Sequence, residues 1–289
     1  MTAKVTQAHI DQYHRDGCVK IESVFDSYWV DMVTRGIDRI IETYETGNQP
    51  EQVTHEGCQA PFFIDGENGT YRILHVAAYS AEIQKWIRES PAAEVLADVM
   101  GTDTLRYWLD GTFAKAGTAA DTATPWHNDE CTYPLSGVHS ASLWMALTDV
   151  AEDNAPLLTL QGSNNDTYRY HSGFSPQDVE RPPEFRPWSE LVDRVNAPDA
   201  PIQSWPAKAG DILVIHPKTI HGSAPRTGSG GGRRLAFSSR WIGDDIRYAP
   251  NPLSLNLALK DGGTEPIVGE PLPEDSFPIT WRRTVRQAA

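Results

Sequence analysis

The chain has 289 residues, of which 39 % are hydrophobic and 22 % are charged, and its formal net charge is −14. This composition is sufficient for a sizeable core and excludes a disordered chain. The length fits one large domain or two small ones. The acidic balance argues against a nucleic-acid-binding surface, which would be basic.

Cysteine usage and hydropathy indicate the compartment. The three cysteines, Cys18, Cys58 and Cys131, are scattered and odd in number, so no disulfide framework or zinc-type pair is expected. The chain has no apolar run long enough to span a bilayer and no apolar signal segment after Met1. We therefore expect a cytoplasmic protein that does not bind membranes.

The first hundred residues predict helices. Thr6 is expected to cap a first helix that ends at Gly17, and Cys18–Ile21 follows as a short strand. Asp26 then caps a longer helix, whose apolar residues recur on one face until Gly47.

Loop and helix signals alternate in the next fifty residues. Residues 48–70 are rich in Gly, Asn and Glu and are expected to form a loop. Ser80 begins another helix, Ser90-Pro91 restarts it with proline at the first helical position, and Gly101 ends it.

From Leu105 onward the apolar residues alternate, which is typical of strands. The expected strands are Leu105–Ala114, Ala141–Asp149, Leu157–Gln161, Asp211–Ile215 and Leu235–Trp241. Helices followed by short strands favour a mainly β fold, a β-sandwich or jelly roll with flanking α-helices.

We expect a single domain over residues 1–289. The N-terminal helices occupy residues 6–101, and the β core follows over about 104–248. A polar, proline-rich insertion at 162–203 interrupts the core, and a connection of that length is typical of a functional lid. The tail, 249–289, is expected to wrap the surface.

Two histidines and one carboxylate suggest a metal site. His127 and Asp129 are two residues apart, so on a strand their side chains point to the same face. His221 follows 94 residues after His127. Two histidines and a carboxylate are the ligand set of non-haem iron(II) oxygenases, which leaves positions open for a co-substrate and O₂. An H-x-D pair alone also recurs by chance, with the histidine paired to a local carboxylate.

Further motifs resemble, in order, those of the phytanoyl-CoA dioxygenase-like family of Fe(II)- and 2-oxoglutarate-dependent oxygenases. The similar segments extend from about residue 6 to 242. They are Gln7–Ile21, Lys115-Ala116-Gly117, Trp126-His127-Asn128-Asp129, Asp153–Leu157, Gln161-Gly162-Ser163, Gly210–His216, His221-Gly222-Ser223 and Arg233–Trp241. Ala155 and Asn164 depart from the family's usual glycine and histidine.

This resemblance implies a double-stranded β-helix (jelly roll, cupin-like) core. It also implies a 2-oxoglutarate-dependent dioxygenase in which His127, Asp129 and His221 bind Fe(II). 2-Oxoglutarate and O₂ would be consumed to give succinate and CO₂, while a C–H bond of a small organic molecule is hydroxylated or otherwise oxidised.

Four further residues are assigned to the co-substrate by the same resemblance. Arg233 is expected to bind the far carboxylate of 2-oxoglutarate, because the arginine fork suits a carboxylate. Ser223 would donate to that carboxylate, Trp144 would pack beside the co-substrate, and Lys115 would contact it. Trp144 is equally suited to be a core aromatic. Arg234 points to the opposite face of its strand from Arg233, and it remains an alternative together with Arg226.

The carboxylate ligand narrows the chemistry. Halogenating relatives have a small residue in place of Asp129, so its presence favours an oxygenative outcome.

His216, near the end of a strand, is interpreted as structural. A non-catalytic metal- or ligand-binding jelly roll and, less favoured, a zinc hydrolase remain as alternatives. The acidic balance points weakly to a neutral or cationic substrate. The sequence predicts neither the substrate nor the oligomeric state.

Overall fold

The structure is a computed structural model. It describes residues 5–53, 63–67, 69–116, 122–171, 181–228, 232–257, 259 and 262–284. Cys58 lies outside these ranges. Among the described residues, no helix combines the length and apolar character needed to cross a membrane.

The N-terminal helix begins and ends as its sequence predicts. Helix α1 (Gln7–Asp16) has Thr6 as its N-cap in a capping box with His9, and Gly17 ends it in the left-handed conformation. Strand β1 (Cys18–Ile21) follows within the predicted bounds.

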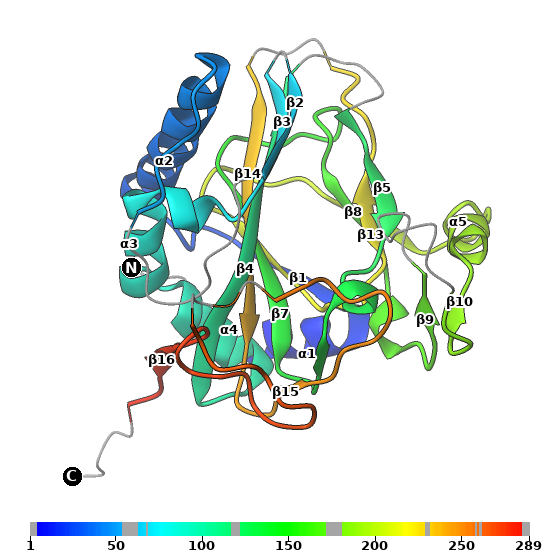
Figure 1. Ribbon diagram of the computed structural model, residues 1–289. Coiled ribbons are helices and arrows are strands. Elements are labelled where there is room, and N and C mark those ends of the chain that lie inside the picture. The colour runs from blue at the N-terminus through cyan, green and yellow to red at the C-terminus, as the bar shows by residue number, and fades with distance from the viewer. Residues whose placement is uncertain are drawn as a thin grey trace.

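Three further helices flank the large sheet. Asp26 caps α2 (Ser27–Glu45) by accepting a hydrogen bond from the Trp29 backbone. Ser80 caps α3 (Ala81–Glu89) in the same way. The next helix, α4 (Ala92–Met100), begins one residue later than predicted, so that Pro91 is its N-cap. Figure 1 shows α2 and α3 beside the face of the sheet that contains β14, β4 and β3.

Two sheets make up the β core. The larger is ordered β1-β12-β7-β14-β4-β3-β2, with β16 also paired to β4, and the smaller is ordered β11-β8-β13-β5. The strands of the large sheet beyond β1 are β2 (Phe63–Glu67), β3 (Thr70–Leu74), β4 (Thr104–Lys115), β7 (Ser140–Ala146), β12 (Ile212–Ile215), β14 (Arg234–Ile242) and β16 (Ile279–Arg282). The small sheet consists of β5 (Thr124–His127), β8 (Leu157–Leu160), β11 (Ile202–Trp205) and β13 (His221–Ser223).

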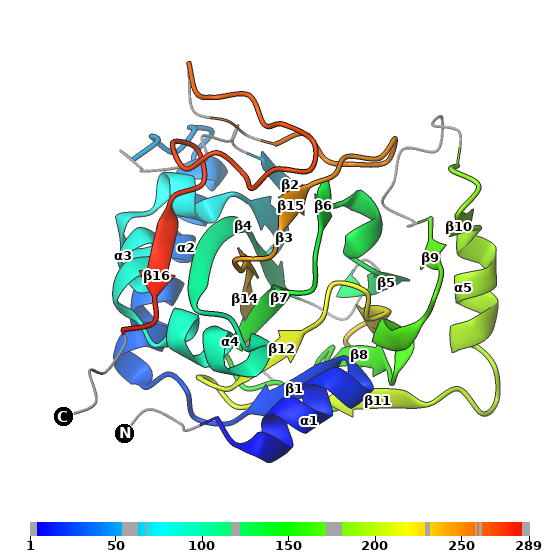
Figure 2. The same cartoon turned by 90° about the horizontal axis from the view of Figure 1, so that it is seen from below.

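The two sheets curve around a shared interior (Figure 2), as expected for a jelly-roll core. A cluster of buried residues from both sheets, including Trp144, Leu157, Leu213 and Ala236, fills part of that interior. The largest hydrophobic cluster lies between the large sheet and the N-terminal helices and includes Ile37, Trp86 and Phe237. The prediction of a mainly β, cupin-like core with flanking helices is therefore confirmed.

The prediction of a loop over 48–70 is wrong for its last part. Residues 63–67 and 70–74 pair as the hairpin β2–β3, which extends the large sheet because Tyr71 to Leu74 pair with β4. Gly66 and Gly69 have positive φ in this hairpin, and such glycines resemble a loop in the sequence alone. Residues 54–62 and 68 lie outside the described part of the chain.

The predicted insertion contains short elements of its own: a 3₁₀ turn, η4 (Ser163–Asn165), the strands β9 (Arg169–Tyr170) and β10 (Phe185–Arg186), and helix α5 (Trp188–Val195). Its final residues already belong to β11 of the small sheet. Leu191 and Val195 of α5 pack with Leu160 and Ile220, so the helix covers the outside of that sheet (Figure 2).

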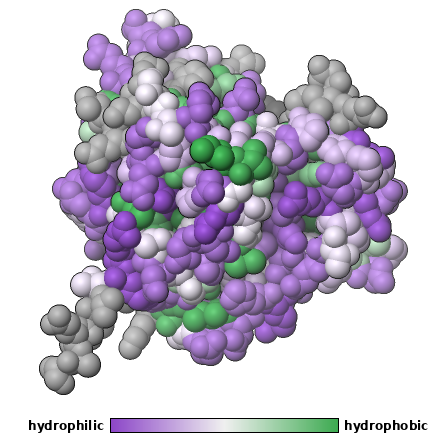
Figure 3. Space-filling model, turned by 60° about the horizontal axis from the view of Figure 1, so that its bottom comes forward, coloured by the Kyte–Doolittle hydropathy of each residue, from purple (hydrophilic) through white to green (hydrophobic). Residues whose placement is uncertain are grey.

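The C-terminal segment returns to the core. The two-residue strand β15 (Arg247–Tyr248) pairs with β6 (Leu135–Ser136), and β16 pairs with β4. Figure 3 shows that the face at this end is mostly hydrophilic, with apolar side chains gathered in small areas. The exposed large hydrophobic residues of this end include Leu255, Ile267 and Val268.

Candidate active site

The three predicted metal ligands converge between the two sheets. His127 is the last residue of β5 and His221 the first of β13, and the two are direct partners in the antiparallel ladder. Asp129 follows β5. One ligand atom from each of the three residues lies within 4.8 Å of the other two, and His127 Nε2 lies 3.6 Å from Asp129 Oδ1. The candidate ligand set is therefore assembled by the fold.

Both imidazole rings are oriented by backbone carbonyls. His127 Nδ1 lies 2.7 Å from the Pro125 carbonyl oxygen, and His221 Nδ1 lies 2.8 Å from that of Thr219. A proton on each Nδ1 donates to these carbonyls, which leaves the lone pair of Nε2 directed at the shared space. Metal-binding histidines are commonly oriented by such a bond.

Asp129 reaches the site differently from the prediction. The H-x-D pair does not lie within one strand, because Asp129 has helical backbone angles at the start of the short 3₁₀ helix η3 (Glu130–Thr132). The backbone N–H groups of Asp129 and Glu130 both donate to the Pro217 carbonyl oxygen, which holds this turn beside β13. The turn, rather than strand alternation, brings the carboxylate to the histidines.

Electrostatics keep His127 and Asp129 in the forms that bind a metal. Burial, together with the neighbouring His221, lowers the pKa of His127 to about 3, so its imidazole is neutral at physiological pH. Burial alone would raise the pKa of Asp129, but Arg240, the two histidines and the Tyr133 hydroxyl together outweigh it and hold that pKa below its usual range. Neutral imidazoles and an ionised carboxylate are the protonation states that metal coordination requires.

A small cavity of about 40 Å³ adjoins the triad. It is lined by the three candidate ligands and by residues that include Trp144, Ser223 and Arg234. The Arg234 side chain is buried, and its guanidinium carbon lies 4.9 Å from the centre of the Trp144 ring. The buried Nε of Arg234 has no hydrogen-bond partner among the described residues. The cavity thus contains a cation with an unused donor.

The expectation that Arg233 serves this cavity has to be corrected. Its guanidinium forms an ion pair with Asp38 of helix α2, outside the barrel, and 31 % of its side chain is exposed. Adjacent residues of a strand point to opposite faces, so Arg233 and Arg234 cannot both enter the cavity. The third candidate, Arg226, donates instead to the carbonyl oxygens of Lys115 and Gly232.

Lys115 lines a neighbouring cavity and contacts two residues that line this one, Ser223 and Thr124. Lys115 Nζ donates to Ser223 Oγ at 2.6 Å and to Thr124 Oγ1 at 2.8 Å. Burial and the charge of Arg234 lower the pKa of Lys115 to about 6. Ser223 Oγ also accepts from the Thr124 backbone, so its hydroxyl proton is available to a further acceptor. Trp144 lines the cavity and belongs to the core as well.

His216 lies apart from the triad. Its Nδ1 accepts a hydrogen bond from the Lys218 backbone, and its ring lies 5.8 Å from that of Tyr13. These contacts fit a structural residue.

The sequence interpretation missed Arg240. This residue lines the cavity, and its Nε lies 3.8 Å from Asp129 Oδ2. The even spacing Arg234, Ser238, Arg240 along one strand was the available signal, because alternate residues share a face.

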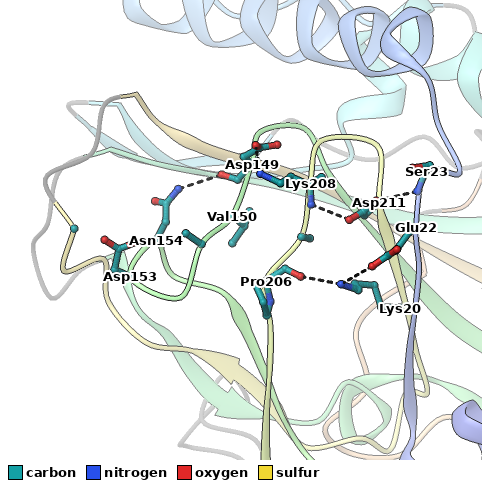
Figure 4. A pocket seen from close by; sticks show the side chains of 13 residues that line it. Lys20, Glu22, Ser23, Asp149, Val150, Asp153, Asn154, Pro206, Lys208 and Asp211 are labelled. Carbon is teal, nitrogen blue, oxygen red and sulfur yellow. Dashed lines mark hydrogen bonds and ion pairs between the residues drawn. The ribbon is translucent and has the colours of Figure 1, made fainter.

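A larger cavity lies elsewhere in the described part of the chain. It measures about 590 Å³ and is lined by residues of β1 and of the turns around Asp149 and Lys208 (Figure 4). Both of its lysines are paired, Lys20 with Glu22 at 3.1 Å and Lys208 with Asp149 at 2.8 Å. A second cluster of candidate metal ligands, His139, Asp244 and Asp245, is partly exposed. The Asp245 carboxylate accepts hydrogen bonds from the backbone of Val138 and His139.

Solved structures of low sequence identity share the fold. The carbocyclase SnoK from nogalamycin biosynthesis, described as non-heme and alpha ketoglutarate dependent, has a TM-score of 0.68 at 19 % identity over 96 % of this chain and 98 % of its own. The epimerase SnoN, in complex with Fe³⁺, alpha ketoglutarate and nogalamycin RO, has a TM-score of 0.67 at 20 % identity over 95 % and 98 %.

A third similar structure is EctD from S. alaskensis with 2-oxoglutarate and 5-hydroxyectoine. Its TM-score is 0.62 at 14 % identity, over 87 % of this chain and 80 % of that one. No curated protein sequence matches the chain.

The family itself is shown by sequence. The model of the family described as Phytanoyl-CoA dioxygenase (PhyH) matches residues 13–235, which include the triad, Lys115, Ser223 and Arg234. This match covers about three quarters of the chain, and the prediction of the family is confirmed. The chain belongs to the phytanoyl-CoA dioxygenase family of iron- and 2-oxoglutarate-dependent oxygenases.

Proposed function

We propose that His127, Asp129 and His221 bind Fe(II) and that the protein uses 2-oxoglutarate and O₂ to oxidise a C–H bond of a small organic molecule. The observation that carries this proposal is the convergence of the three ligand atoms within 4.8 Å beside a cavity that contains a buried arginine. The donor set of two imidazoles and one carboxylate suits Fe(II), and it leaves coordination positions for a co-substrate and O₂.

Arg234 takes the co-substrate role that the sequence assigned to Arg233. A dicarboxylic 2-oxo acid bound at the metal needs a cation for its far carboxylate, and Arg234 is the buried cation of this cavity. Its pKa is lowered to about 10 by burial and by the charge of Arg226, so it remains protonated at neutral pH. Ser223 and Lys115 are placed to donate to the same carboxylate, and Trp144 packs against the Arg234 guanidinium.

When bound, the iron supplies the oxidative chemistry, with decarboxylation of 2-oxoglutarate to succinate and CO₂. The chain's own residues orient the three metal-binding side chains, neutralise the charge of the far carboxylate of 2-oxoglutarate and exclude water from the interior. The similar structures are described as a carbocyclase, an epimerase and an enzyme with bound 5-hydroxyectoine. These descriptions support a small-molecule substrate and an outcome among hydroxylation, cyclisation and related oxidations.

The insertion over 162–203 is proposed as a cover for the site. Trp188 Nε1 donates to the carbonyl oxygen of Trp126, which precedes the metal histidine, at 3.1 Å. Arg169 pairs with Glu130, which follows Asp129, at 2.9 Å. The insertion therefore contacts both residues that flank the His127–Asp129 pair. The buried thiols of Cys18 and Cys131 support the proposal of a reducing cytoplasm.

Anaerobic titration tests the proposed function. Fe(II) and 2-oxoglutarate added together should give a visible charge-transfer absorption that neither gives alone. Under air, the same mixture should convert 2-oxoglutarate slowly to succinate without added substrate. A protein that binds zinc but gives neither signal would be a hydrolase or a binding protein, and the proposal would be rejected.

A further inference from the structure

One oxygen of the Asp129 carboxylate is held by three side chains. Tyr133 donates its hydroxyl to Asp129 Oδ2 at 2.9 Å, and Ser142 donates to the same oxygen at 3.2 Å. Arg240 Nε lies 3.8 Å from it. The other oxygen, Oδ1, lies 3.6 Å from His127 Nε2. The two carboxylate oxygens therefore have separate environments.

The three side chains come from separate elements. Tyr133 follows the 3₁₀ helix η3, while Ser142 lies on β7 and Arg240 on β14, where the two are direct register partners. Tyr133 is also fixed by a perpendicular ring contact with Trp108 at 4.4 Å. Two adjacent strands of the large sheet and the residue after η3 thus contribute to the position of one oxygen.

Arg240 is confined to this place by its surroundings. Its Nη1 donates to the Ser238 carbonyl oxygen at 3.2 Å, and 13 % of its side chain is exposed. A Cβ atom at Gly111 would lie 3.9 Å from Nη1, an ordinary contact distance, so the guanidinium lies over β4 at this residue. The register shift of β14 relative to β4 also falls at Arg240 and Trp241.

We propose that Arg240 is a positioning residue for the metal centre: with Tyr133 and Ser142 it holds Asp129 Oδ2, so that Oδ1 alone is presented to the metal. This inference rests on the proposed function, because it assumes a metal at the triad. A carboxylate whose second oxygen is free can turn and bind a metal through both oxygens. It would then occupy a coordination position that the co-substrate or O₂ requires.

The test measures metal binding directly and does not depend on turnover. The Arg240→Gln variant removes the charge and keeps a side chain of similar reach, whereas Arg240→Lys keeps the charge. We expect Arg240→Gln to weaken Mn²⁺ or Co²⁺ binding, measured by calorimetry, by about 10- to 100-fold, the range found for partners of metal ligands. Arg240→Lys should recover at least part of this loss.

A second readout reports on the coordination itself. The visible absorption of the Co²⁺-loaded protein depends on the number and arrangement of ligands. It should change in Arg240→Gln and in Tyr133→Phe, which removes one hydrogen bond to Oδ2. The matched control is Arg106→Gln on the neighbouring strand β4, because Arg106 also pairs with a carboxylate and 12 % of its side chain is exposed. That variant should keep both the affinity and the spectrum of the wild type.

The outcomes separate this inference from the proposed function. If the wild-type protein binds no Co²⁺ or Mn²⁺ at the triad, the proposed function fails and the inference fails with it. If the wild type binds but Arg240→Gln and Tyr133→Phe match it in affinity and spectrum, only the inference is overturned. Circular dichroism establishes folding, and should Arg240→Gln not fold, the comparison of Arg240→Lys and Tyr133→Phe with the control decides.

Discussion

His127 and His221 face each other across the antiparallel pair β5–β13, with ring centres 4.2 Å apart, although 94 residues separate them in the chain. A backbone ladder therefore sets the distance between the two imidazoles. Sites built on strands are held more precisely than sites built on loops. The carboxylate is the ligand that comes from a turn, and it is the one that needs side chains to hold it.

Replacement of Asp129 by alanine should abolish metal-dependent turnover. The variant loses the only carboxylate of the candidate triad, and the two histidines that remain offer too few ligands for a site of this type. Loss of a ligand should exceed the 10- to 100-fold effect of losing a ligand's partner, so we expect Fe(II) affinity to fall by more than about 100-fold. Succinate formation and calorimetry with Mn²⁺ measure the two effects. Retained turnover would refute the assignment of the ligand.

Arg234 and Arg233 should differ sharply in their effect on 2-oxoglutarate. Arg234→Gln removes the buried cation of the cavity. Hydrogen bonds to charged groups contribute about 1.5–3 kcal/mol, which corresponds to roughly a 10- to 150-fold rise in the KM for 2-oxoglutarate. Arg233→Gln breaks only the outer ion pair with Asp38, in which both side chains are about one third exposed. Such pairs contribute about 0–1 kcal/mol to stability, so this variant should leave the KM for 2-oxoglutarate nearly unchanged.

Steady-state kinetics with varied 2-oxoglutarate distinguishes the two variants. A large rise in KM for Arg233→Gln with none for Arg234→Gln would restore the original prediction from the sequence and overturn the placement in the structure.

The difference between these two arginines shows where sequence reasoning stops. The alternation over Leu235–Trp241 predicted β14 to within one residue at each end, and it placed Arg233 and Arg234 on opposite faces. It did not say which face is inside, because a shift of one residue exchanges the faces of a strand. Pairing decides this: Arg234 lies opposite Lys115 of β4, and Asp38 of α2 holds Arg233 outside.

Contacts between distant segments also explain why the sequence did not predict the hairpin β2–β3 or the groups around Asp129 Oδ2. Strand β2, with Asp65, Gly66 and Glu67, has little strand character of its own, and the hairpin β2–β3 is stabilised by the pairing of β3 with β4. The three groups around Asp129 Oδ2 come from residues 133, 142 and 240. The three candidate metal ligands, by contrast, could be proposed from the sequence, because a short motif contains two of them and few residue types bind iron. Helix bounds were predictable because capping residues such as Thr6 and Asp26 act locally.

Lys115 should give the folded protein a pH-dependent stability. Its pKa in the folded state is about 6, lowered first by burial and then by the charge of Arg234, whereas a lysine in the unfolded chain has its ordinary value of 10.5. Between these values the unfolded state binds more protons, so stability rises with pH, by up to about 1.4 kcal/mol per pH unit.

Denaturant unfolding of the metal-free protein at pH 7 and pH 9 measures this effect. We expect Lys115→Met to lose the rise, since its side chain does not titrate, and to become less stable relative to the wild type as the pH increases. Parallel pH dependence of the two proteins would show that Lys115 stays protonated when buried.

Gly222 should be necessary for the distance between the two histidines. It lies between His221 and Ser223 on β13, and a Cβ atom there would come within 2.8 Å of the Thr124 carbonyl oxygen and 3.3 Å of the Trp126 Cα on β5. These contacts are with backbone, which cannot turn away. Gly222→Ala must therefore push β5 from β13 and separate His127 from His221. Overpacking of this kind costs about 1–3 kcal/mol.

The matched control is Gly101→Ala. Gly101 has a φ of 74° and nothing within 4 Å of its Cβ position, so alanine there adds backbone strain of about 1–2 kcal/mol without touching the site. Both variants should lower the free energy of unfolding by similar amounts, but only Gly222→Ala should weaken Mn²⁺ binding. If Gly222→Ala bound Mn²⁺ as tightly as Gly101→Ala does, the strand pair would tolerate the methyl group, and the spacing of the histidines would not depend on this glycine.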